Sequence, residues 1–450
     1  AITATSGSGD LRLQKGFLLG GTASAGFDTT RQNTNNLRAD INPATSGGLA
    51  LSYVQPLLRG FGLAVNNRYI RIANNNRQVA DLVFEQQVTT TAYTVTRLYW
   101  DLVTLTGQAA VQRQTLALAE RLLAENIQQE QAGTLAPIDV TRARAEVARA
   151  RRDLTVAETS LRQQETILKD YLTRGTVDSA RLMTVRVVAT DNIPSPDVEP
   201  VTPIQDLVET ARGRRPEVLQ AGLQTENARI ALTGSRSSLL PALDLVVNAR
   251  SSSLVGSVNT LPPASGTGGG TGTSLRQPDP AFIGGFGTGI SQLFGARFPD
   301  YSAEVQLTIP ILNRIARADH ARDQLAVRQQ QIRTQQLEKQ LRVEIVNALI
   351  AVEQSRAALQ SALEARTLQE QSLDAERERY AVGASTNFLV IQYQRDLAVA
   401  QQTEVVALSD YAKARAALQR ATGTLLDQFG ISIVDAFREN LPRSEAPVGP

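Results

Sequence analysis

Five long stretches of the chain have the residue pattern of helices. They are rich in Ala, Gln, Arg, Glu and Leu and almost free of Gly and Pro, the residues that break helices. The five stretches are residues 63–132, 137–172, 203–238, 313–382 and 386–426. A stretch of roughly 70 residues is far longer than the mean globular helix of about 11 residues. We therefore expect the longest stretches to pack against other helices as coiled coils, with a single solvated helix as the alternative.

Four shorter segments alternate between apolar and polar residues. The clearest is 301–311, where Val305, Leu307 and Ile309 alternate with polar residues. Such a period of two predicts a strand with one apolar and one polar face. The four predicted strands are residues 17–27, 49–57, 243–249 and 301–311. Strands of about ten residues are long enough to cross a bilayer when tilted. Four strands alone leave open edges, and the alternative is a small soluble sandwich.

The two segments that join these strands are expected to be loops. Residues 28–45 are polar, whereas residues 251–300 are longer and contain the Gly-rich, low-complexity run 262–274 followed by several Phe. The fragment GGFGTG at 284–289 resembles a phosphate-binding loop in its letters. It follows no predicted strand and precedes no helix with a partner acid, so it does not predict a nucleotide site.

The two halves of the chain present the same order of elements. Each has a strand, a loop, a strand that ends in Pro, a long helix, a Gly and a second helix. Pro56 corresponds to Pro310, and Gly133 corresponds to Gly383. The shared order indicates an internal two-fold repeat. Because each Gly stands where one helix ends, we expect a left-handed C-cap there. The residues able to cap the following helix are Thr134, Ser385 and Thr386.

The amino-acid composition excludes several kinds of catalytic and metal-binding site. The 450 residues include no Cys and one His, His320, which excludes thiol catalysis, disulfides and a metal site with three His ligands. The 46 basic against 44 acidic residues give a net charge of +2, so nucleic acid is not an expected partner. No run of about 18 apolar residues predicts a membrane-spanning helix, but strands with one apolar face remain compatible with a membrane barrel. We expect no enzyme, and no catalytic, cofactor or metal site.

Several features together resemble the TolC family of outer-membrane efflux and secretion channels. They are the two-fold repeat, the run RRPEVLQAGLQTENARIALTGSRSSLLPALDLVV at 214–247, the LYWDL at 98–102, and the glycines 133 and 383. The resemblance covers about residues 11–430. It implies an α+β membrane protein, a homotrimer whose twelve-stranded β-barrel has four strands per chain and continues into a long α-helical coiled-coil barrel.

The resemblance also implies a division of the chain into six segments. In order they are a first β-hairpin of the barrel, a first coiled-coil hairpin, an equatorial segment with a helix, a second β-hairpin with a long extracellular loop, a second coiled-coil hairpin and a C-terminal equatorial tail. Their bounds are 1–60, 61–172, 173–238, 239–312, 313–426 and 427–450. The second half has a helix before its first strand, so we expect a signal peptide and a first helix to precede residue 1.

The two helix turns correspond to the periplasmic tip of the family, where an adaptor docks. The docking residues implied are Gly133, Thr134, Gly383 and Ala384. Gated family members carry two acids and an Arg near the second turn, and this chain has Leu389, Gln392 and Ser385 at those positions. We therefore expect a more apolar tip constriction. Its residues would be Asp139, Ser385, Phe388, Leu389 and Gln392.

The function implied is that of a passive exit duct in the outer membrane of a Gram-negative-type bacterium, extending into the periplasm. It would serve a tripartite efflux pump or a type I secretion system. The expected partners are two further copies of the chain, a periplasmic adaptor (membrane fusion) protein, an inner-membrane pump or ABC transporter, and outer-membrane lipid. The alternative is a periplasmic coiled-coil adaptor or structural scaffold without its own pore. Whether the cargo is a small molecule or a protein stays open.

Overall fold

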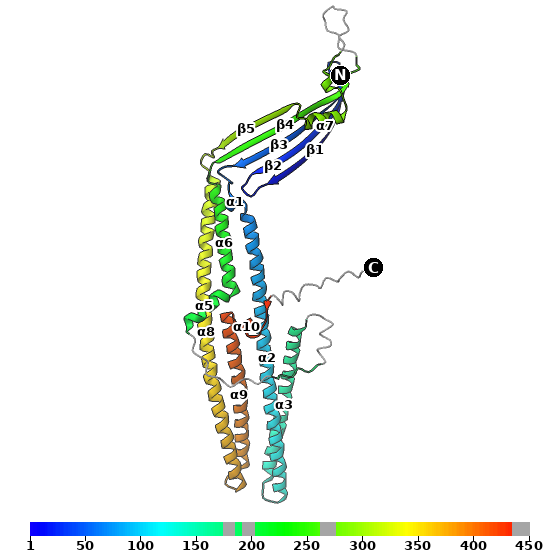
Figure 1. Ribbon diagram of the computed structural model, residues 1–450. Coiled ribbons are helices and arrows are strands. Elements are labelled where there is room, and N and C mark those ends of the chain that lie inside the picture. Colours follow the sequence, from blue (N-terminus) through cyan, green and yellow to red (C-terminus); the bar gives the residue numbers. More distant parts are fainter. Residues whose placement is uncertain (174–184, 191–202, 262–275, 434–450) are drawn as a thin grey trace, which may run out of the picture. The chain divides into compact units, whose positions relative to one another are not determined.

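The structure is a computed structural model that describes residues 1–173, 185–190, 203–261 and 276–433. The chain forms two compact units (Figure 1). Unit 1 comprises residues 1–77 and 223–331, and unit 2 comprises residues 78–222 and 332–450. The predicted combination of long helices with an antiparallel sheet is confirmed.

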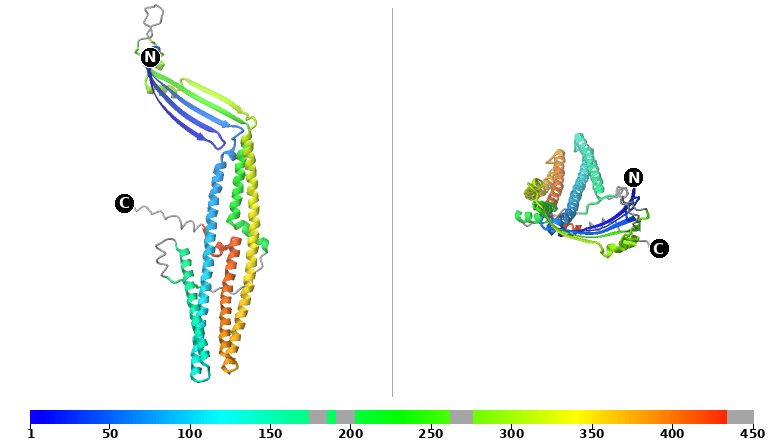
Figure 2. Two further views of the ribbon diagram at one scale, coloured as in Figure 1. Left: turned by 180° about the vertical axis from the view of Figure 1, so that it is seen from behind. Right: turned by 90° about the horizontal axis from the view of Figure 1, so that it is seen from above.

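Unit 1 is built on one antiparallel sheet whose five strands lie side by side in chain order (Figure 2). The strands are β1 (Ala4–Gly16), β2 (Thr22–Thr34), β3 (Ile41–Pro56), β4 (Ala242–Val258) and β5 (Pro299–Thr308). A short helix α1 (Leu63–Asn66), the 3-10 helix η1 (Pro280–Phe282) and the helix α7 (Phe286–Phe294) complete the elements that lie wholly in unit 1.

The sheet has one strand more than the four that the sequence predicts. The additional strand, β1, pairs along its full length with β2, from Ala4 opposite Thr34 to Gly16 opposite Thr22, and all its residues are exposed. Its Gly- and Ser-rich sequence shows no clear apolar face. The ladder is made by backbone N–H and C=O groups, so it forms without a side-chain pattern that could be read from the sequence. The predicted strands correspond to β2, β3, β4 and β5.

Both predicted loops are largely wrong because the strands continue beyond their apolar parts. Within 28–45, β2 runs on to Thr34 and β3 begins at Ile41. Within 251–300, β4 continues to Val258, and η1, α7 and the start of β5 follow. The strand extensions are rich in Ser, Thr and Gly, which pair through the backbone without adding apolar alternation. The low-complexity run 262–274 lies outside the described residues.

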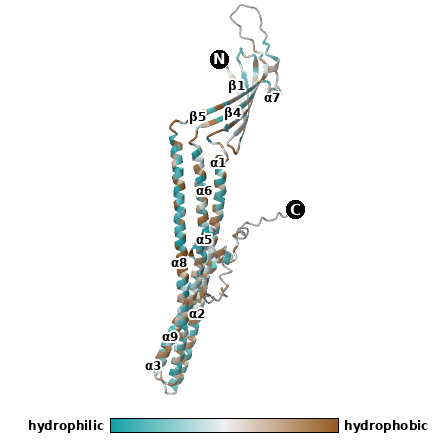
Figure 3. Ribbon diagram, turned by 60° about the vertical axis from the view of Figure 1, so that its left-hand side comes forward, coloured by the Kyte–Doolittle hydropathy of each residue, from teal (hydrophilic) through white to brown (hydrophobic). Residues whose placement is uncertain are grey.

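The sheet has one apolar and one polar face along most of its length. Apart from Ile41 opposite Val258, where the register of β3 and β4 shifts, odd-numbered residues lie opposite odd-numbered residues in all four ladders, so they share one face. The odd face carries a band of apolar side chains, and alternating colours along the strands in Figure 3 follow this pattern. The band comprises Leu11, Leu13, Ala23, Ala25, Phe27, Leu49, Leu51, Tyr53, Leu243, Leu245, Val247, Ala249, Tyr301, Ala303, Val305 and Leu307.

The even face is rich in charged and polar side chains. It carries Asp28 and Arg250, whose carboxylate and guanidinium lie 3.6 Å apart.

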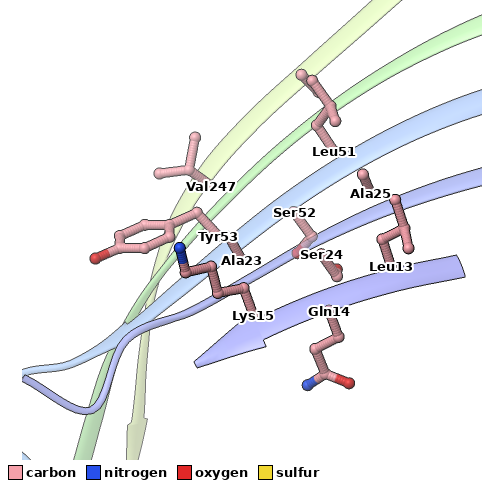
Figure 4. A pocket seen from close by; sticks show the side chains of 11 residues that line it. Leu13, Gln14, Lys15, Ala23, Ser24, Ala25, Leu51, Ser52, Tyr53 and Val247 are labelled. Atoms are coloured by element: carbon pink, nitrogen blue, oxygen red, sulfur yellow. The ribbon is translucent and has the colours of Figure 1, made fainter. Parts of the chain in front are cut away.

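Figure 4 shows the apolar band of the odd face from close by, with Leu13 and Leu51 around a hollow of about 440 Å³. The alternation predicted from the sequence is therefore present in the central part of all five strands.

The described part of unit 2 is helical, and three of its helices also contribute residues to unit 1. The helices are α2 (Arg68–Gln131), α3 (Pro137–Leu172), α5 (Ile204–Arg214), α6 (Pro216–Ser237), α8 (Arg314–Ala381), α9 (Asn387–Thr422) and α10 (Leu425–Gln428). The predicted long helices are confirmed within a few residues. No helix among the described residues has both the length and the apolar character required to cross a membrane.

Three predicted helices are interrupted. The stretch 63–132 is interrupted at Asn67 between α1 and α2, and 386–426 is interrupted at Gly423 and Thr424 between α9 and α10. The stretch 203–238 breaks at Arg215, which has an extended backbone (φ −72°, ψ 119°) between α5 and α6. Pro216 follows directly, and a proline disfavours the helical conformation of the residue before it. Within the predicted equatorial segments 173–238 and 427–450, residues 174–184, 191–202 and 434–450 lie outside the described residues.

Two pairs of helices form the core of unit 2. On α2 and α3, the buried residues Leu102, Ala109, Leu161 and Leu168 pack together. On α8 and α9, Val352, Leu359, Ala407 and Tyr411 pack together with Ala362. The mixture of Leu and Ala at these contacts allows the helices to approach closely, as the sequence predicts for coiled-coil packing.

Candidate functional site: the hairpin turns of unit 2

The two helix hairpins end in turns of the same backbone geometry. Gly133 and Gly383 have φ of 77° and 76°, the left-handed conformation expected from the sequence. The N–H of Gly133 donates to Glu130 O (2.9 Å) and that of Thr134 to Gln129 O (2.9 Å). The second turn repeats both bonds, from Gly383 to Tyr380 and from Ala384 to Arg379. Both turns are therefore Schellman motifs.

The starts of the helices that follow these turns differ. Thr386 caps α9, since its side chain accepts a hydrogen bond from the N–H of Leu389. Helix α3 begins without a side-chain cap and has Pro137 in its first turn, a position where the missing N–H of proline costs nothing. Thr134 donates to Gln129 O (3.0 Å) instead, and Ser385 donates to the carboxylate of Glu376. The capping role predicted for Thr386 is confirmed, and those considered for Thr134 and Ser385 are wrong.

The first turn of α9 sorts its residues into inward and outward sides. Asn387, Val390 and Ile391 are buried, and the last two pack against Leu122 of α2. Phe388 and Leu389 are 54% and 38% exposed. Among the residues predicted to form a constriction, Gln392 is also exposed, whereas Asp139 and Ser385 are partly buried. Phe388, Leu389 and Gln392 therefore point outward from the single chain. They could line a constriction only together with the same residues of further copies of the chain.

An ion pair between α3 and α9 joins the two hairpins close to the tip. The guanidinium of Arg395 donates through Nε to Glu146 Oε1 (3.0 Å) and through Nη2 to Glu146 Oε2. The Glu146 side chain is only 10% exposed, against 41% for Arg395. The hydrogen bond and the charge of Glu146 outweigh burial and raise the pKa of Arg395 above its ordinary value. The Arg395 guanidinium therefore stays charged throughout the physiological range.

A second polar contact crosses between the hairpins from Tyr380. Its hydroxyl donates to Gln129 Oε1 over 3.1 Å. Burial, followed by the charges of Asp139 and Glu125, raises the pKa of the Tyr380 hydroxyl above its ordinary value. Because this shift favours the neutral phenol, the hydroxyl keeps its proton and remains a donor.

The sequence patterns do not single out these joining residues. Glu146 lies in the buried seam of α3 with Ala143, Val147 and Ala150, at the spacing of inward-facing positions. A charged residue at such a position is the signal that points to a buried ion pair. Glu376 is a similar case, being 4% exposed and bonded to Ser385 and Arg379. Asn126, fully buried on α2, has no hydrogen-bond partner for its side chain among the described residues.

Nothing at these turns resembles a reaction centre. Among the described residues, no cluster of His, Asp and Glu has an arrangement able to hold a metal ion. His320 lies on α8 in unit 1, where its Nε2 is 3.0 Å from the Gln324 amide. The described site consists of two alike turns, the exposed Phe388, Leu389 and Gln392, and polar links between the hairpins.

A comparison with protein families decides the identity of the chain. The family model described as outer membrane efflux protein matches residues 15–174 and 207–424, most of the sequence. The chain belongs to the outer membrane efflux protein family. It is therefore an outer-membrane efflux channel protein, and nothing supports the alternative of an adaptor or scaffold without a pore.

Solved structures of outer-membrane proteins and channels share the fold of this family member. CusC is 17% identical with a TM-score of 0.59, over 94% of this chain and 83% of its own. VceC from Vibrio cholerae is 13% identical with a TM-score of 0.59, over 94% and 87%. CmeC from Campylobacter jejuni is 12% identical with a TM-score of 0.56, over 98% and 81%. At these identities the likeness concerns the fold alone. None of the curated proteins compared with the sequence matches it significantly.

Proposed function

We propose that three copies of this chain form a passive exit duct, a barrel in the outer membrane followed by a helical tunnel in the periplasm. The observation that carries the proposal is the two-faced sheet of unit 1, with its continuous apolar band on the odd positions and charged residues on the even ones. Such a pattern suits lipid on one side and water on the other. Membership in the efflux family supports the same arrangement.

The antiparallel order of the strands favours four strands per chain in that barrel. A ring that is antiparallel throughout needs an even number of strands, and three chains with five strands each would supply fifteen. With β2 to β5 from each chain, β5 of one copy runs antiparallel to β2 of the next. The edge of β2 is paired with β1 in the single chain. We therefore infer that β1 leaves this edge when three copies assemble into a twelve-stranded barrel.

The hairpin turns supply the periplasmic end of the proposed duct. Gly133, Thr134, Gly383 and Ala384 are all exposed, which makes them accessible to a periplasmic adaptor protein. Phe388, Leu389 and Gln392 face outward beside them, and three copies brought together there would form an apolar constriction, with Asp139 and Ser385 behind. Constrictions lined by apolar side chains close pores by excluding water.

The proposed partners follow from a passive duct. The described residues offer no reaction centre, so the energy for export would come from an inner-membrane pump or ABC transporter through the adaptor. The six segments expected from the sequence would be two β-hairpins for the barrel, two coiled-coil hairpins for the tunnel, and an equatorial segment and tail around it. The alike Schellman turns at 133 and 383 support the two-fold repeat behind this division.

Two matched substitutions on β3 test the proposal. Leu51 lies on the odd face and Ser52, its neighbour, on the even face. Leu51→Arg should reduce insertion into vesicles, because an arginine facing lipid near the midplane costs about 2–4 kcal/mol. Ser52→Arg should insert normally and alter the ion selectivity of the conductance in planar bilayers. Equal insertion of both variants, or no stepwise conductance from the unmodified protein, would contradict the duct.

The tip constriction has its own test. Leu389→Asp would place an acid in each copy near the proposed narrowing. The single-channel current of this variant should become sensitive to block by divalent cations, which the unmodified channel should resist. A variant whose conductance is unaffected by divalent cations would remove Leu389 from the constriction.

A further inference from the structure

The helix α7 lies on the apolar side of the sheet, beyond the end of the apolar band. It packs over β3 and β4, where Gly47, Ser253 and Val255 are odd-face residues. Only about 10 Å³ of space remains between the helix and these strands. The position is at the end of the strands that carries the connections 35–40 and 259–298, opposite the end that leads into the helices. Helix α7 therefore does not cover the polar face.

The attachment of α7 to the sheet is specific. Its buried residues, Gly289, Gln292 and Leu293, form one stripe at the spacing of a helix face. The Ser251 hydroxyl donates to Leu293 O (2.8 Å), and the Gln292 side chain accepts from Leu254 N (3.2 Å). Gln292 Nε2 also donates to the carbonyl of Ala281 (2.6 Å), which ties α7 to η1.

Two glycines lie where α7 and the strands approach closely. A Cβ added to Gly289 would come within 3.1 Å of Val255, and one added to Gly47 within 3.4 Å of Leu293 and 2.9 Å of the Ser253 hydroxyl. A side chain at either glycine would therefore press on its neighbours unless they shifted. The placement of α7 is built into the fold of unit 1.

The exposed residues of α7 are uncharged and include two phenylalanines beside Gly287, Thr288 and Ser291. Phe286 and Phe294 are 55% and 75% exposed, and the 17 residues from Pro280 to Ala296 include no charged residue. Four of the 11 phenylalanines of the chain lie between positions 282 and 298, and the rings of Phe282 and Phe298 stack with centroids 5.7 Å apart. A segment exposed to water would normally carry charges, and exposed aromatic residues are typical of membrane interfaces.

The surface beneath α7 explains why a helix is required there. Along the odd face the strands change from apolar residues to Thr29, Thr45, Ser251 and Ser253 at the end where α7 lies. The helix covers these polar residues and presents phenylalanine in their place. The apolar odd face thus continues past the point where the strands themselves stop being apolar.

We propose that α7 is an interfacial helix, which inserts Phe286 and Phe294 among the lipids of the outer leaflet on the outside of the barrel. The inference rests on the proposed function, since it takes the odd face to be the lipid-facing one. Short amphipathic helices bind lipid surfaces in this way, with aromatic and aliphatic side chains at the boundary between headgroups and acyl chains. The partner is the bilayer surface, and α7 is not a plug for the pore.

The absence of cysteine from the chain allows a clean test with single labels. Nitroxide would be attached to Phe294→Cys, Val247→Cys and Ser302→Cys in channels reconstituted into vesicles of phosphatidylcholine and phosphatidylglycerol. Val247 belongs to the band and Ser302 to the even face. Collision of each label with oxygen, which concentrates in the bilayer, is compared with collision with a water-soluble nickel chelate. Phe286→Cys provides a second position on α7.

Labels at 294 and 247 are expected to collide more often with oxygen than with the nickel chelate, and the label at 294 should lie at a shallower depth in the bilayer than the label at 247. The label at 302 is expected to collide more often with the nickel chelate. A label at 294 that behaves like the one at 302, while 247 reports lipid, overturns the interfacial helix and leaves the duct intact. Dipolar broadening between labels at 294 would also overturn it, because α7 would then contact a second copy. Labels at 247 and 294 that are both aqueous overturn the proposed function as well.

Discussion

The two hairpin turns of unit 2 have the same backbone and different side chains. Gly133 and Gly383 adopt nearly identical left-handed conformations, followed by the same pair of hydrogen bonds. The first turn then starts α3 with a proline, whereas the second starts α9 with a capping Thr386. The glycine is what reverses the chain, because few other residues tolerate its φ, whereas a helix start can be built in several ways. Side chains near each turn are therefore free to serve contacts between hairpins.

The contact expected to matter most is the pair between Arg395 and Glu146. Arg395→Ala would leave the Glu146 carboxylate buried and unpaired, and should lower the free energy of local opening between α3 and α9 by about 2 kcal/mol. Hydrogen exchange of the α3 and α9 amides of the intact protein, followed by mass spectrometry, measures this. Glu146→Gln should cost less, since the half-exposed Arg395 can turn to water.

Arg113 provides the matched control for this pair. It is bound to Glu158 at 2.8 Å within the first hairpin, and both side chains are substantially exposed. An exposed pair contributes about 0.2–1 kcal/mol, so Arg113→Ala should change exchange little. Equal effects of the two arginine substitutions would show that the burial of Glu146 does not increase the contribution of its ion pair to stability.

The next effect concerns the glycines themselves. Gly133→Ala and Gly383→Ala should each destabilise their turn by about 1 kcal/mol, because a Cβ is strained in the left-handed region. No atom lies within 4 Å of the added Cβ at either position, so the cost is conformational. Faster exchange at the turn amides, to a similar extent in both hairpins, is the expected observation.

Gly222 tests whether that cost comes from the turn. It lies exposed in the middle of α6, also with no atom within 4 Å of an added Cβ. There Gly222→Ala should stabilise the helix by up to about 1 kcal/mol. If the turn variants were stabilised like Gly222→Ala, strain in the left-handed conformation would not be the cause of any effect at the two turns.

A smaller effect is expected at Tyr380, which links the second hairpin to the first. Tyr380→Phe removes the bond to Gln129 and should cost about 0.5 kcal/mol, since the site is only partly buried. The pKa of Tyr380 is raised in the folded protein, so its stabilisation is complete below the ordinary tyrosine pKa near 10. It is lost as the pH rises through the higher folded value.

The pH dependence separates this contribution from simple loss of packing. Thermal unfolding of the unmodified protein should become easier as the pH rises above about 10, and Tyr380→Phe should show a weaker dependence. Parallel profiles for the two proteins would mean that Tyr380 does not keep its proton preferentially in the folded state.

The smallest effect distinguishes the two helix starts. Thr386→Ala removes the α9 cap and should cost about 0.5 kcal/mol, at the low end of measured caps because its bond is 3.4 Å long. Thr134→Ala should cost less, since the Thr134 hydroxyl only adds to the backbone bond that Gln129 O already accepts. Exchange at the first amides of α3 and α9 compares them, and a greater loss at Thr134 would reverse the proposed difference.

Much of the fold was predictable because it rests on local patterns. Breaker-free stretches predicted the helices, and glycines 133 and 383 predicted both turns with their conformation. Period-two alternation found the apolar parts of β2 to β5. It missed β1 and the ends of the strands, because ladders of Ser, Thr and Gly form through backbone groups. The short helix α7 was missed because its segment lies in a Gly-rich stretch. The helix prediction for 203–238 joined α5 to α6, although Pro216 indicates a break at Arg215.

The candidate site was predictable in position and not in its contacts. The sequence located both helix turns, since these depend on residues close together in the chain, whereas the exposure of Phe388 and Leu389 is known from the structure. It could not pair Arg395 with Glu146, because 249 residues separate them and the bond depends on which faces of α3 and α9 meet.

By itself, the sequence determined where helices run, where they reverse and which face of each central strand is apolar. These features follow from backbone conformation and from the spacing of side chains along one element. The tertiary structure decided which charges are buried together, how far each strand extends and that α7 lies on the apolar side of the sheet. Each of these depends on surfaces brought together from distant parts of the chain, and only packing selects among the pairings that a sequence allows.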